Sequence, residues 1–262
     1  MSRLAAVLTA EVVAHDAGVA IRHHAHDAGQ LSVVLGGTMT VTVERGWWLV
    51  PPGLAIWIPP GEIHAARYSE SSRLINLKFD AGYAARLPDH GVPLVVSDLL
   101  RELAHEAVTL SGKAAMADVL QLIAGLVVHQ VRLPVDAPGL FVPNGRDRRL
   151  RHVTDMLRDQ PGNNASIEVL AALAHTSSRT LARLFVEETS LTFGRWREHL
   201  RVVCAVDRLT RGQSITRTAL ELGYQSASSF TTLFTRLLGE PPRRYMRRWE
   251  KSGAPERDND GM

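Results

Sequence analysis

The 262-residue sequence predicts an α+β protein in which an all-β barrel is followed by a helical connector and an all-helical domain. Up to Phe79 the chain consists of short β-type runs separated by Gly and Pro pairs, whereas beyond residue 145 the apolar residues recur at helical spacing. A Pro- and Gly-rich stretch, "LPVDAPGLFVPNGRD", separates the two parts and is typical of a linker. With 45% hydrophobic residues, the chain can bury a core in each part.

The β part has the spacing of an antiparallel barrel or jelly roll. Runs such as "QLSVVLGG", "TMTVTVERG", "LAIWIPPG" and "SRLINLKF" are punctuated by Gly-Gly or Pro-Pro-Gly every ~8–12 residues, and residues 38–43 alternate strictly between apolar and polar. We therefore predict a barrel over residues 1–93.

Two amphipathic helices are predicted in the connector, in "SDLLRELAHEAVTL" and "MADVLQLIAGLVVHQV", with Ser97 and Asp98 placed to start the first. Their apolar faces can form a dimer seam or pack back on the barrel. These faces carry Leu99, Leu100, Leu103, Ala107, Leu120, Ile123 and Val127. The expected boundaries are 1–93 for the barrel, 94–145 for the connector and linker, 146–250 for the helical domain and 251–262 for a disordered polar tail.

The net charge of +3 conceals an asymmetry between the two halves. Residues 145–250 carry 18 arginines and no lysine against 11 acidic residues, whereas residues 1–144 are mildly acidic. Arginine forms bidentate contacts with phosphates and guanine edges, so the second half is a candidate for binding nucleic acid. An ordinary solvated basic surface would explain the charge alone equally well.

The single cysteine, Cys204, rules out an internal disulfide and a multi-cysteine zinc site. No apolar run looks long enough to span a membrane, and the N-terminus lacks a convincing cleavage site. We expect a cytoplasmic protein.

The helical half contains a weak internal repeat. The series Ala171, His175, Ser177, Leu181, Phe185 is echoed by Ala219, Gly223, Ser226, Phe230, Phe234. Each copy predicts a short helix, a turn, and a Ser that caps a second helix with apolar residues four positions apart. This is the helix-turn-helix pattern, stated twice. About twenty residues of helical pattern separate the copies, which predicts a rod of roughly 30 Å, close to the spacing of successive major-groove faces.

These residues resemble the DNA-binding domain of the AraC/XylS family of bacterial transcription regulators. The resemblance covers about a hundred residues, and "ALELGYQSASSFTTLF" followed by "GEPPRRY" is its most specific part. It implies a regulator that binds promoter DNA, a small-molecule effector and RNA polymerase, and that forms a homodimer.

The resemblance also implies which side chains face DNA. Arg179, Thr180 and Arg183 would project from the first recognition helix, with one arginine reading guanine; a phosphate contact is equally compatible with Arg179. The second recognition helix carries small outward residues, which suit backbone and thymine-methyl contacts. The expected DNA-binding residues are Ser178, Arg179, Thr180, Arg183, Gln225, Ser226, Ala227, Ser228, Thr231 and Thr232.

The sequence departs from the family pattern at two turns. His175 and Ser190 stand where glycine is usual. If either position needs a positive φ, it costs a non-glycine residue about 1 kcal/mol.

The first half resembles a cupin, a barrel family that often uses histidine ligands. The segment from Gly18 to Gly37 has the form G-x5-H-x-H-x3-Q-x6-G, in which Gln30 replaces the usual Glu, and Gly53 to His64 has the form G-x5-P-x-G-x2-H. By the two-residue period of a strand, His24 and His26 share one face, so His64 could meet them inside the barrel. Three histidines and one oxygen donor suit a first-row divalent metal. The alternative interpretation is a metal-free effector pocket lined by His24, His26, Gln30, Trp57 and His64.

Two functional hypotheses follow. In the first, a cupin-like sensor binds a small effector and alters promoter binding by the double helix-turn-helix domain, with no catalysis. In the rival, the regulator senses a divalent ion through His24, His26 and His64, with Gln30 as a fourth donor. A cupin metalloenzyme is a third alternative, for which the sequence offers only Glu62 and Tyr68 as acid or base.

Overall fold

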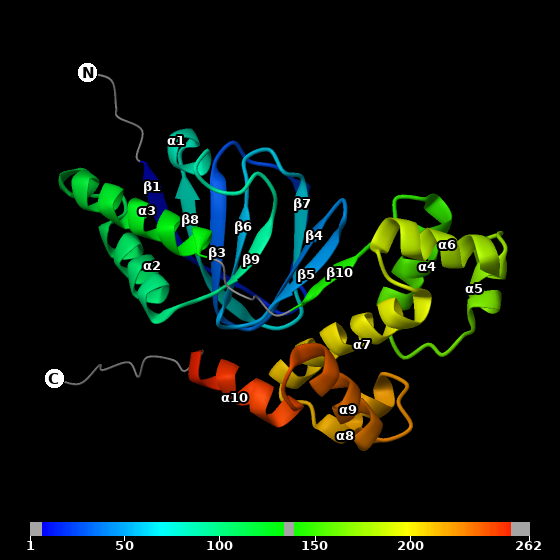
Figure 1. Ribbon diagram of the computed structural model, residues 1–262. Coiled ribbons are helices and arrows are strands. Elements are labelled where there is room, and N and C mark those ends of the chain that lie inside the picture. Colours follow the sequence, from blue (N-terminus) through cyan, green and yellow to red (C-terminus); the bar gives the residue numbers. More distant parts are fainter. Residues whose placement is uncertain (1–6, 134–138, 253–262) are drawn as a thin grey trace.

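The computed structural model describes residues 7–133 and 139–252 and confirms the predicted fold class (Figure 1). An N-terminal β domain of two antiparallel sheets is followed by two helices and a C-terminal helical domain. Most of the expected tail, residues 253–262, lies outside the described residues. Its first two residues, Lys251 and Ser252, still belong to the last helix, so the tail boundary was placed two residues too early.

The two sheets have five strands each. The first has the order β1 (Leu8–His15), β8 (Ser72–Phe79), β3 (Gly29–Gly36), β6 (Leu54–Ile58) and β9 (Val92–Val95). The second has the order β10 (Phe141–Pro143), β5 (Gly46–Val50), β4 (Met39–Val43), β7 (His64–Tyr68) and β2 (Ala20–His24). Successive side chains of β3 and β6 point to opposite faces of the first sheet, so this sheet contributes to two hydrophobic cores. Val34, Ile56 and Ile58 face the space between the sheets, whereas Leu31, Val33 and Trp57 face outward.

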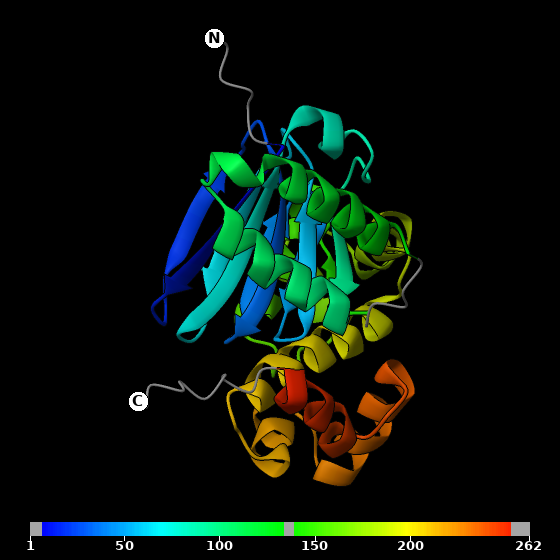
Figure 2. The same cartoon turned by 90° about the vertical axis from the view of Figure 1, so that its left-hand side faces the viewer.

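The outer face of the first sheet is covered by the connector helices (Figure 2). These are α2 (Asp98–Leu110), the short η1 (Ala114–Met116) and α3 (Ala117–Arg132); α1 (Ala81–Ala84) adds to the same layer. The connector therefore packs back on the barrel through Leu100, Ala107, Leu120, Ile123 and Val127. Residues 114–132 are long and apolar enough to span a membrane by length and composition, contrary to our expectation, but one face of this helix packs on the outer face of the first sheet.

The predicted linker contributes to the barrel. Residues 141–143 form β10, which pairs with β5 at the edge of the second sheet. A Pro at a strand end or an edge is tolerated because the missing donor faces no partner, which explains Pro143 at the end of β10. Residues 134–138 of the predicted linker lie outside the described residues, and from β10 onward the chain enters the helical domain directly from a sheet edge.

The helical domain contains α4 (Arg148–Asp159), α5 (Ile167–Leu173), α6 (Ser178–Thr189), α7 (Phe193–Thr210), α8 (Ile215–Glu221), α9 (Ala227–Leu238) and α10 (Pro242–Ser252). The repeat predicts this arrangement: α5–α6 and α8–α9 are two helix-turn-helix units, and α7 lies between them (Figure 1). Leu181, Phe185, Phe230 and Phe234 are fully buried, as expected for the core positions of the repeat.

Both positions where the family pattern has glycine adopt a positive φ. His175 has a φ of 51° and Ser190 a φ of 60°, and these are the two non-glycine residues with positive φ in the described part of the chain. Ser190 is the left-handed C-cap of α6, a conformation in which a Cβ approaches the following carbonyl oxygen. The departure from glycine therefore strains the turns on both sides of the first recognition helix.

Replacing Ser190 with Gly is expected to raise the free energy of unfolding by about 0.5–1 kcal/mol, because the relief of strain exceeds the entropy that glycine adds to the unfolded chain. Urea unfolding of the purified protein would measure the change. Ser190→Ala is the matched control, since it retains the Cβ and is expected to give no gain; equal stabilisation by both variants would contradict the argument.

Candidate functional site

The first recognition helix, α6, begins at a serine cap, as the repeat predicts. Ser177 Oγ accepts a hydrogen bond of 3.1 Å from the Thr180 amide, and the two hydroxyls lie 2.9 Å apart. Arg179 and Arg183 are exposed, whereas Ser178 and Thr180 are partly buried. Ala182 and Val186 are exposed between and beyond the arginines, and the sequence reasoning missed them. The helical period puts Arg179, Ala182, Arg183 and Val186 on one face.

The two arginines of this face differ in their availability. Arg183 Nη1 donates to Glu187 Oε2 at 2.6 Å, an i,i+4 ion pair between half-exposed side chains. Arg179 takes part in none of the hydrogen bonds or ion pairs found among the described residues. Arg179 could therefore contact DNA without losing a partner, whereas Arg183 would give up its ion pair with Glu187.

The second recognition helix, α9, presents small polar side chains. Ser226 caps it, accepting from the Ser229 amide at 3.1 Å, so the Ser226 hydroxyl is engaged in the helix start. Thr231 and Thr232 donate their hydroxyls to the carbonyls of Ala227 and Ser228, four residues back. Gln225, Ser228 and Thr232 are exposed, whereas Ala227 and Thr231 are partly buried. This helix carries no charge on those positions, in keeping with contacts to backbone and thymine methyl groups.

The spacer between the units is α7, whose 18 residues span about 27 Å. Trp196, Leu200, Val203 and Val206 bury one of its faces in the domain core. The Trp196 indole nitrogen donates to the Pro143 carbonyl at 2.8 Å, and its ring packs against Phe185. Trp196 is therefore a packing residue that also ties α7 to β10.

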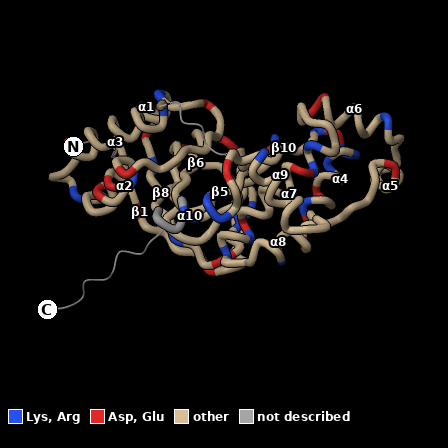
Figure 3. Tube along the Cα trace, turned by 60° about the horizontal axis from the view of Figure 1, so that its bottom comes forward, with Lys and Arg blue, Asp and Glu red and all other residues tan. Residues whose placement is uncertain are grey.

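Many arginines of the helical domain already have partners within the protein, and Figure 3 shows acidic segments lying among the basic ones there. Arg201, one of the 18 arginines of residues 145–250, is 7% exposed. Its guanidinium donates to the carbonyls of Pro161 and Asn163 and to Asn164 Oδ1, and it stacks on Tyr224. Other internal ion pairs join Arg208 and Arg217 to Glu221, Arg211 to Asp207, and Arg236 to Glu198. The count of 18 arginines in residues 145–250 is therefore larger than the number of arginines that have no partner within the protein.

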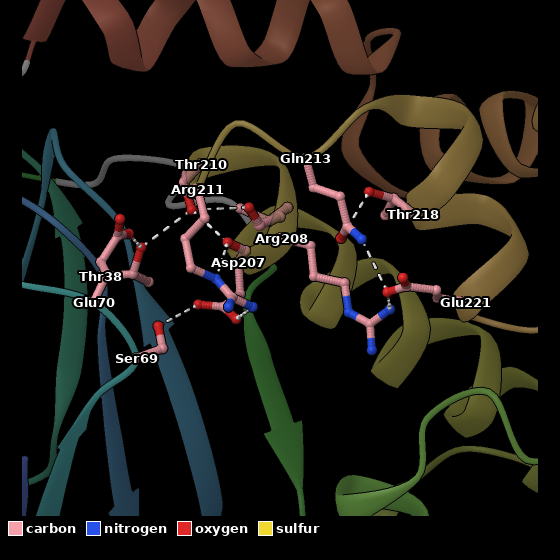
Figure 4. A network of polar contacts seen from close by, with 11 residues as sticks. Thr38, Ser69, Glu70, Asp207, Arg208, Thr210, Arg211, Gln213, Thr218 and Glu221 are labelled. Atoms are coloured by element: carbon pink, nitrogen blue, oxygen red, sulfur yellow. Dashed lines mark hydrogen bonds and ion pairs between the residues drawn. The ribbon is translucent and has the colours of Figure 1, made fainter. Parts of the chain in front are cut away.

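The C-terminal end of α7 is bonded to two turns of the barrel (Figure 4). Ser69 Oγ donates to Asp207 Oδ1 at 2.8 Å, and the Thr38 and Thr210 hydroxyls lie 3.1 Å apart. Thr38 also donates to Glu70. We call these five residues, Thr38, Ser69, Glu70, Asp207 and Thr210, the α7 latch. Arg208, one residue beyond Asp207, donates to Glu221 of α8 at 2.8 Å, so the contact continues to the second helix-turn-helix unit.

A second contact joins the barrel to α4. Arg158 of α4 donates to Thr42 Oγ1 at 3.1 Å and lies over the ring of Trp47, 4.8 Å from its centroid. Desolvation by burial lowers the pKa of Arg158, with nearby Asp155 opposing the shift. This guanidinium is thus held between the two domains.

A groove of about 1270 Å³ opens beside this contact, and we call it the interdomain groove. Its walls come from the barrel, from β10 and from α4, and they include Arg45, Trp48, Pro59–Ile63, Phe141, Arg151, Asp155 and Arg158. Burial raises the pKa of Glu62, partly offset by a hydrogen bond to the Gly91 backbone, and the Glu62 Oε2 atom is buried without a hydrogen-bond partner. Burial also raises the pKa of Asp155. The groove therefore offers both cationic and partly desolvated carboxyl groups.

The three predicted histidines converge. His24 at the end of β2 is opposite His64 at the start of β7, and their ring centroids are 4.3 Å apart. His26 lies 5.1 Å from His64 by the same measure. Burial lowers the pKa of His64, while its hydrogen bond to the Glu62 carbonyl raises it. The predicted convergence of the three histidines is confirmed, but His26 lies beyond the end of β2 and His24 is exposed rather than inside the barrel.

Two other predicted pocket residues lie elsewhere. Trp57 faces the core under the connector helices and donates its indole hydrogen to the Pro88 carbonyl at 2.8 Å, so its assignment as an effector contact was wrong. Successive strand residues point to opposite faces, and Trp57 lies on the outward one. The Gln30 amide nitrogen donates to Ser32 and Asn76. Tyr68 stacks on His15, and burial raises its pKa to about 12, which leaves it poorly placed to act as a base.

Comparison with known proteins identifies the family to which this architecture belongs. A family model described as a helix-turn-helix domain matches residues 170–248, and one described as an AraC-like ligand binding domain matches residues 11–123. A double helix-turn-helix domain joined to a ligand-binding barrel defines a DNA-binding transcription regulator. The HTH-type transcriptional regulator NimR of Escherichia coli (strain K12) is 31% identical over 229 residues, which are 86% of this chain and 82% of the relative. The chain belongs to the AraC family of transcriptional regulators.

Other relatives are more distant. The HTH-type transcriptional activator RhaS of Escherichia fergusonii is 24% identical, over 86% of this chain and 87% of its own length. The crystal structure of unsaturated fatty acid bound ToxT from Vibrio cholerae aligns with 94% of this chain and 97% of that chain at 12% identity and a TM-score of 0.39.

Proposed function

We propose that this regulator binds promoter DNA through α6 and α9, and that a small effector bound in the interdomain groove changes this binding. The α7 latch is the observation that supports the proposal, because it links barrel turns directly to the helix that spaces the two recognition helices. A ligand that binds the latched and released arrangements with different affinity shifts the population between them.

The groove suits an effector better than the barrel interior does. Buried apolar side chains from both sheets occupy the space between them: Val34, Met39, Val41, Ile56, Ile58 and Leu74. A ligand in the groove would instead touch the barrel, β10 and α4 together, and would meet Arg151 and Arg158 on the DNA-binding side. Carboxylate or phosphate groups would suit these arginines.

We further propose a cytoplasmic homodimer that contacts RNA polymerase on the promoter. The side of α3 that faces away from the barrel exposes Val119, Leu122 and Leu126, of which Leu122 is 70% exposed. The spacing of these residues makes one apolar stripe along the helix, which is a surface for a second copy.

Selection of genomic fragments by the purified chain, followed by footprinting, tests both proposals. Each chain should protect two consecutive major-groove faces about 34 Å apart, and a dimer should protect two such sites. Binding without preference for any fragment at physiological salt would reject the regulator mechanism, and a single site with one chain bound would reject the dimer.

The latch itself makes a local prediction. Ser69→Ala removes the hydrogen bond to Asp207 without altering any helix, so amides in the last turn of α7 and in α8 should exchange about 2- to 10-fold faster with solvent deuterium, as expected for losing one hydrogen bond. Amides of α5 and α6 should be unchanged.

Ser71→Ala is the matched control, because Ser71 is exposed in the same turn and its side chain forms none of the hydrogen bonds found in the described part of the chain. If the amides of α7 and α8 exchange at the same rate in Ser69→Ala as in Ser71→Ala, the latch does not restrain α8.

A further inference from the structure

The exposed face of α6 carries two apolar side chains beside its arginines. Val186 is 50% exposed, and Ala182, four residues earlier, is exposed as well. At about 100° per residue, these two side chains lie within an arc of roughly 100° that also holds Arg179 and Arg183. A partner that contacts the arginines of α6 therefore meets the two apolar side chains at the same time.

The packing of the domain does not use the Val186 side chain. Among the described residues, the partly buried apolar side chains that pack against this core include Leu191 and Phe193 but not Val186. A β-branched residue is also a weaker helix former than alanine, because the helix restricts its χ1 rotamers. The apolar surface of Val186 is therefore available to a partner outside the chain.

The major groove of DNA offers a methyl group to such a helix. This group is the C5-methyl of thymine, which contacts alanine and other apolar side chains, whereas guanine, adenine and cytosine are read by their hydrogen-bond donors and acceptors. Residues four apart on a helix have Cβ atoms about 5–6 Å apart. A methyl carbon in contact with both side chains at about 4 Å therefore fits between Ala182 and Val186.

The charges on the same face favour DNA over an apolar protein surface as the partner. An apolar protein surface would desolvate the guanidinium groups of Arg179 and Arg183 without giving them hydrogen-bond acceptors, which is costly. DNA supplies phosphates and guanine edges as acceptors at the same place as the thymine methyl groups. The mixture of apolar and cationic side chains on this face thus matches the major groove.

We propose that Ala182 and Val186, which we call the apolar pair, bind the methyl group of one thymine in the promoter. The proposal rests on the proposed function, since it requires that α6 lie in the major groove. Val186 lies three residues beyond Arg183, which at about 1.5 Å per residue is roughly 4.5 Å along the helix. Because successive base pairs are about 3.4 Å apart, the thymine lies about one or two base pairs from the base that Arg183 contacts.

Deoxyuridine substitution tests the proposal, because it removes the methyl group and leaves the hydrogen-bonding groups of the base in place. The full chain is titrated with the duplex defined by footprinting, and each thymine of that duplex is replaced in turn. We expect one thymine, within about two base pairs of the position at which Arg183→Ala relaxes the preference, where deoxyuridine weakens binding about 4-fold. This is the effect expected for the loss of one buried methyl group.

Val186→Ala should weaken binding to the unmodified duplex about 3- to 10-fold, because it removes two carbon atoms from the contact. In this variant, deoxyuridine at the same position should weaken binding no more than about 2-fold, since most of the methyl contact is already lost. The variant should remain folded, because alanine is the better helix former at an exposed position. Circular dichroism verifies the folding.

Val169→Ala is the matched control. Val169 is 52% exposed on α5, the other helix of the same helix-turn-helix unit, and does not belong to the apolar pair. Its variant should bind the unmodified duplex as the unaltered chain does and should keep the full deoxyuridine effect.

The proposal is overturned if deoxyuridine has no effect at any thymine near the position that Arg183 contacts, or if its effect is the same in Val186→Ala as in the unaltered chain. Preferential binding to a promoter without these effects would reject the apolar pair and leave the regulator mechanism intact. A chain without preference for any fragment would reject both.

Discussion

Replacing Arg183 with Ala is expected to weaken binding to the cognate promoter by about 1–3 kcal/mol and to relax the preference at one base pair. Arg183 lies on the exposed face of α6, where a guanidinium can form two parallel hydrogen bonds with guanine O6 and N7. Competition binding against promoters mutated one base pair at a time would measure both the affinity and the preference.

The ion pair between Arg183 and Glu187 supplies a matched control. Glu187→Gln removes the acidic partner, so Arg183 no longer gives up an ion pair when it meets DNA, and binding should strengthen modestly. Arg179→Ala should also weaken binding, but uniformly over all sequences if Arg179 contacts phosphate. If Arg183→Ala weakens binding equally on every sequence, Arg183 is the phosphate contact instead.

Replacing Arg201 with Ala is expected to lower the free energy of unfolding by about 2–4 kcal/mol. Three oxygens, from Pro161, Asn163 and Asn164, would lose the charged donor that they share in this partly buried contact, and the ring of Tyr224 would lose its stacked guanidinium. Desolvation by burial lowers the pKa of Arg201, the direction expected for a charged group removed from water. Chemical denaturation would measure the loss.

Two variants separate the role of the guanidinium from that of charge. Arg201→Lys keeps a cation but cannot present the planar fork, so it should recover less than half of the lost stability. Arg195→Ala removes an exposed arginine of the same helix and should change stability by no more than about 0.5 kcal/mol. A stable Arg201→Ala protein with weakened DNA binding would instead make Arg201 a DNA contact.

Local patterns in the sequence were sufficient to predict the helix starts and the turns of the DNA-binding half. A serine before an apolar period predicts a helix start, and Ser177 and Ser226 both cap their helices. The turn positions of His175 and Ser190 could be anticipated because a positive φ is a property of a few consecutive residues. The meeting of His24 and His64 was anticipated from the cupin resemblance of the two motifs.

Only the tertiary structure decided which partner each side chain takes. The sequence shows that Arg201 and Arg183 are cations, but it does not show which of them is buried. The carbonyl that accepts from Arg201 is 40 residues away in the chain, and Arg183 is exposed because of how α6 packs on the rest of the domain. Likewise, Trp57 belongs to the face that α2 and α3 cover, and residues 141–143 pair with β5 nearly a hundred positions earlier. Backbone propensity acts over a few residues, whereas burial and pairing depend on the whole fold, so the elements were predictable and their contacts were not.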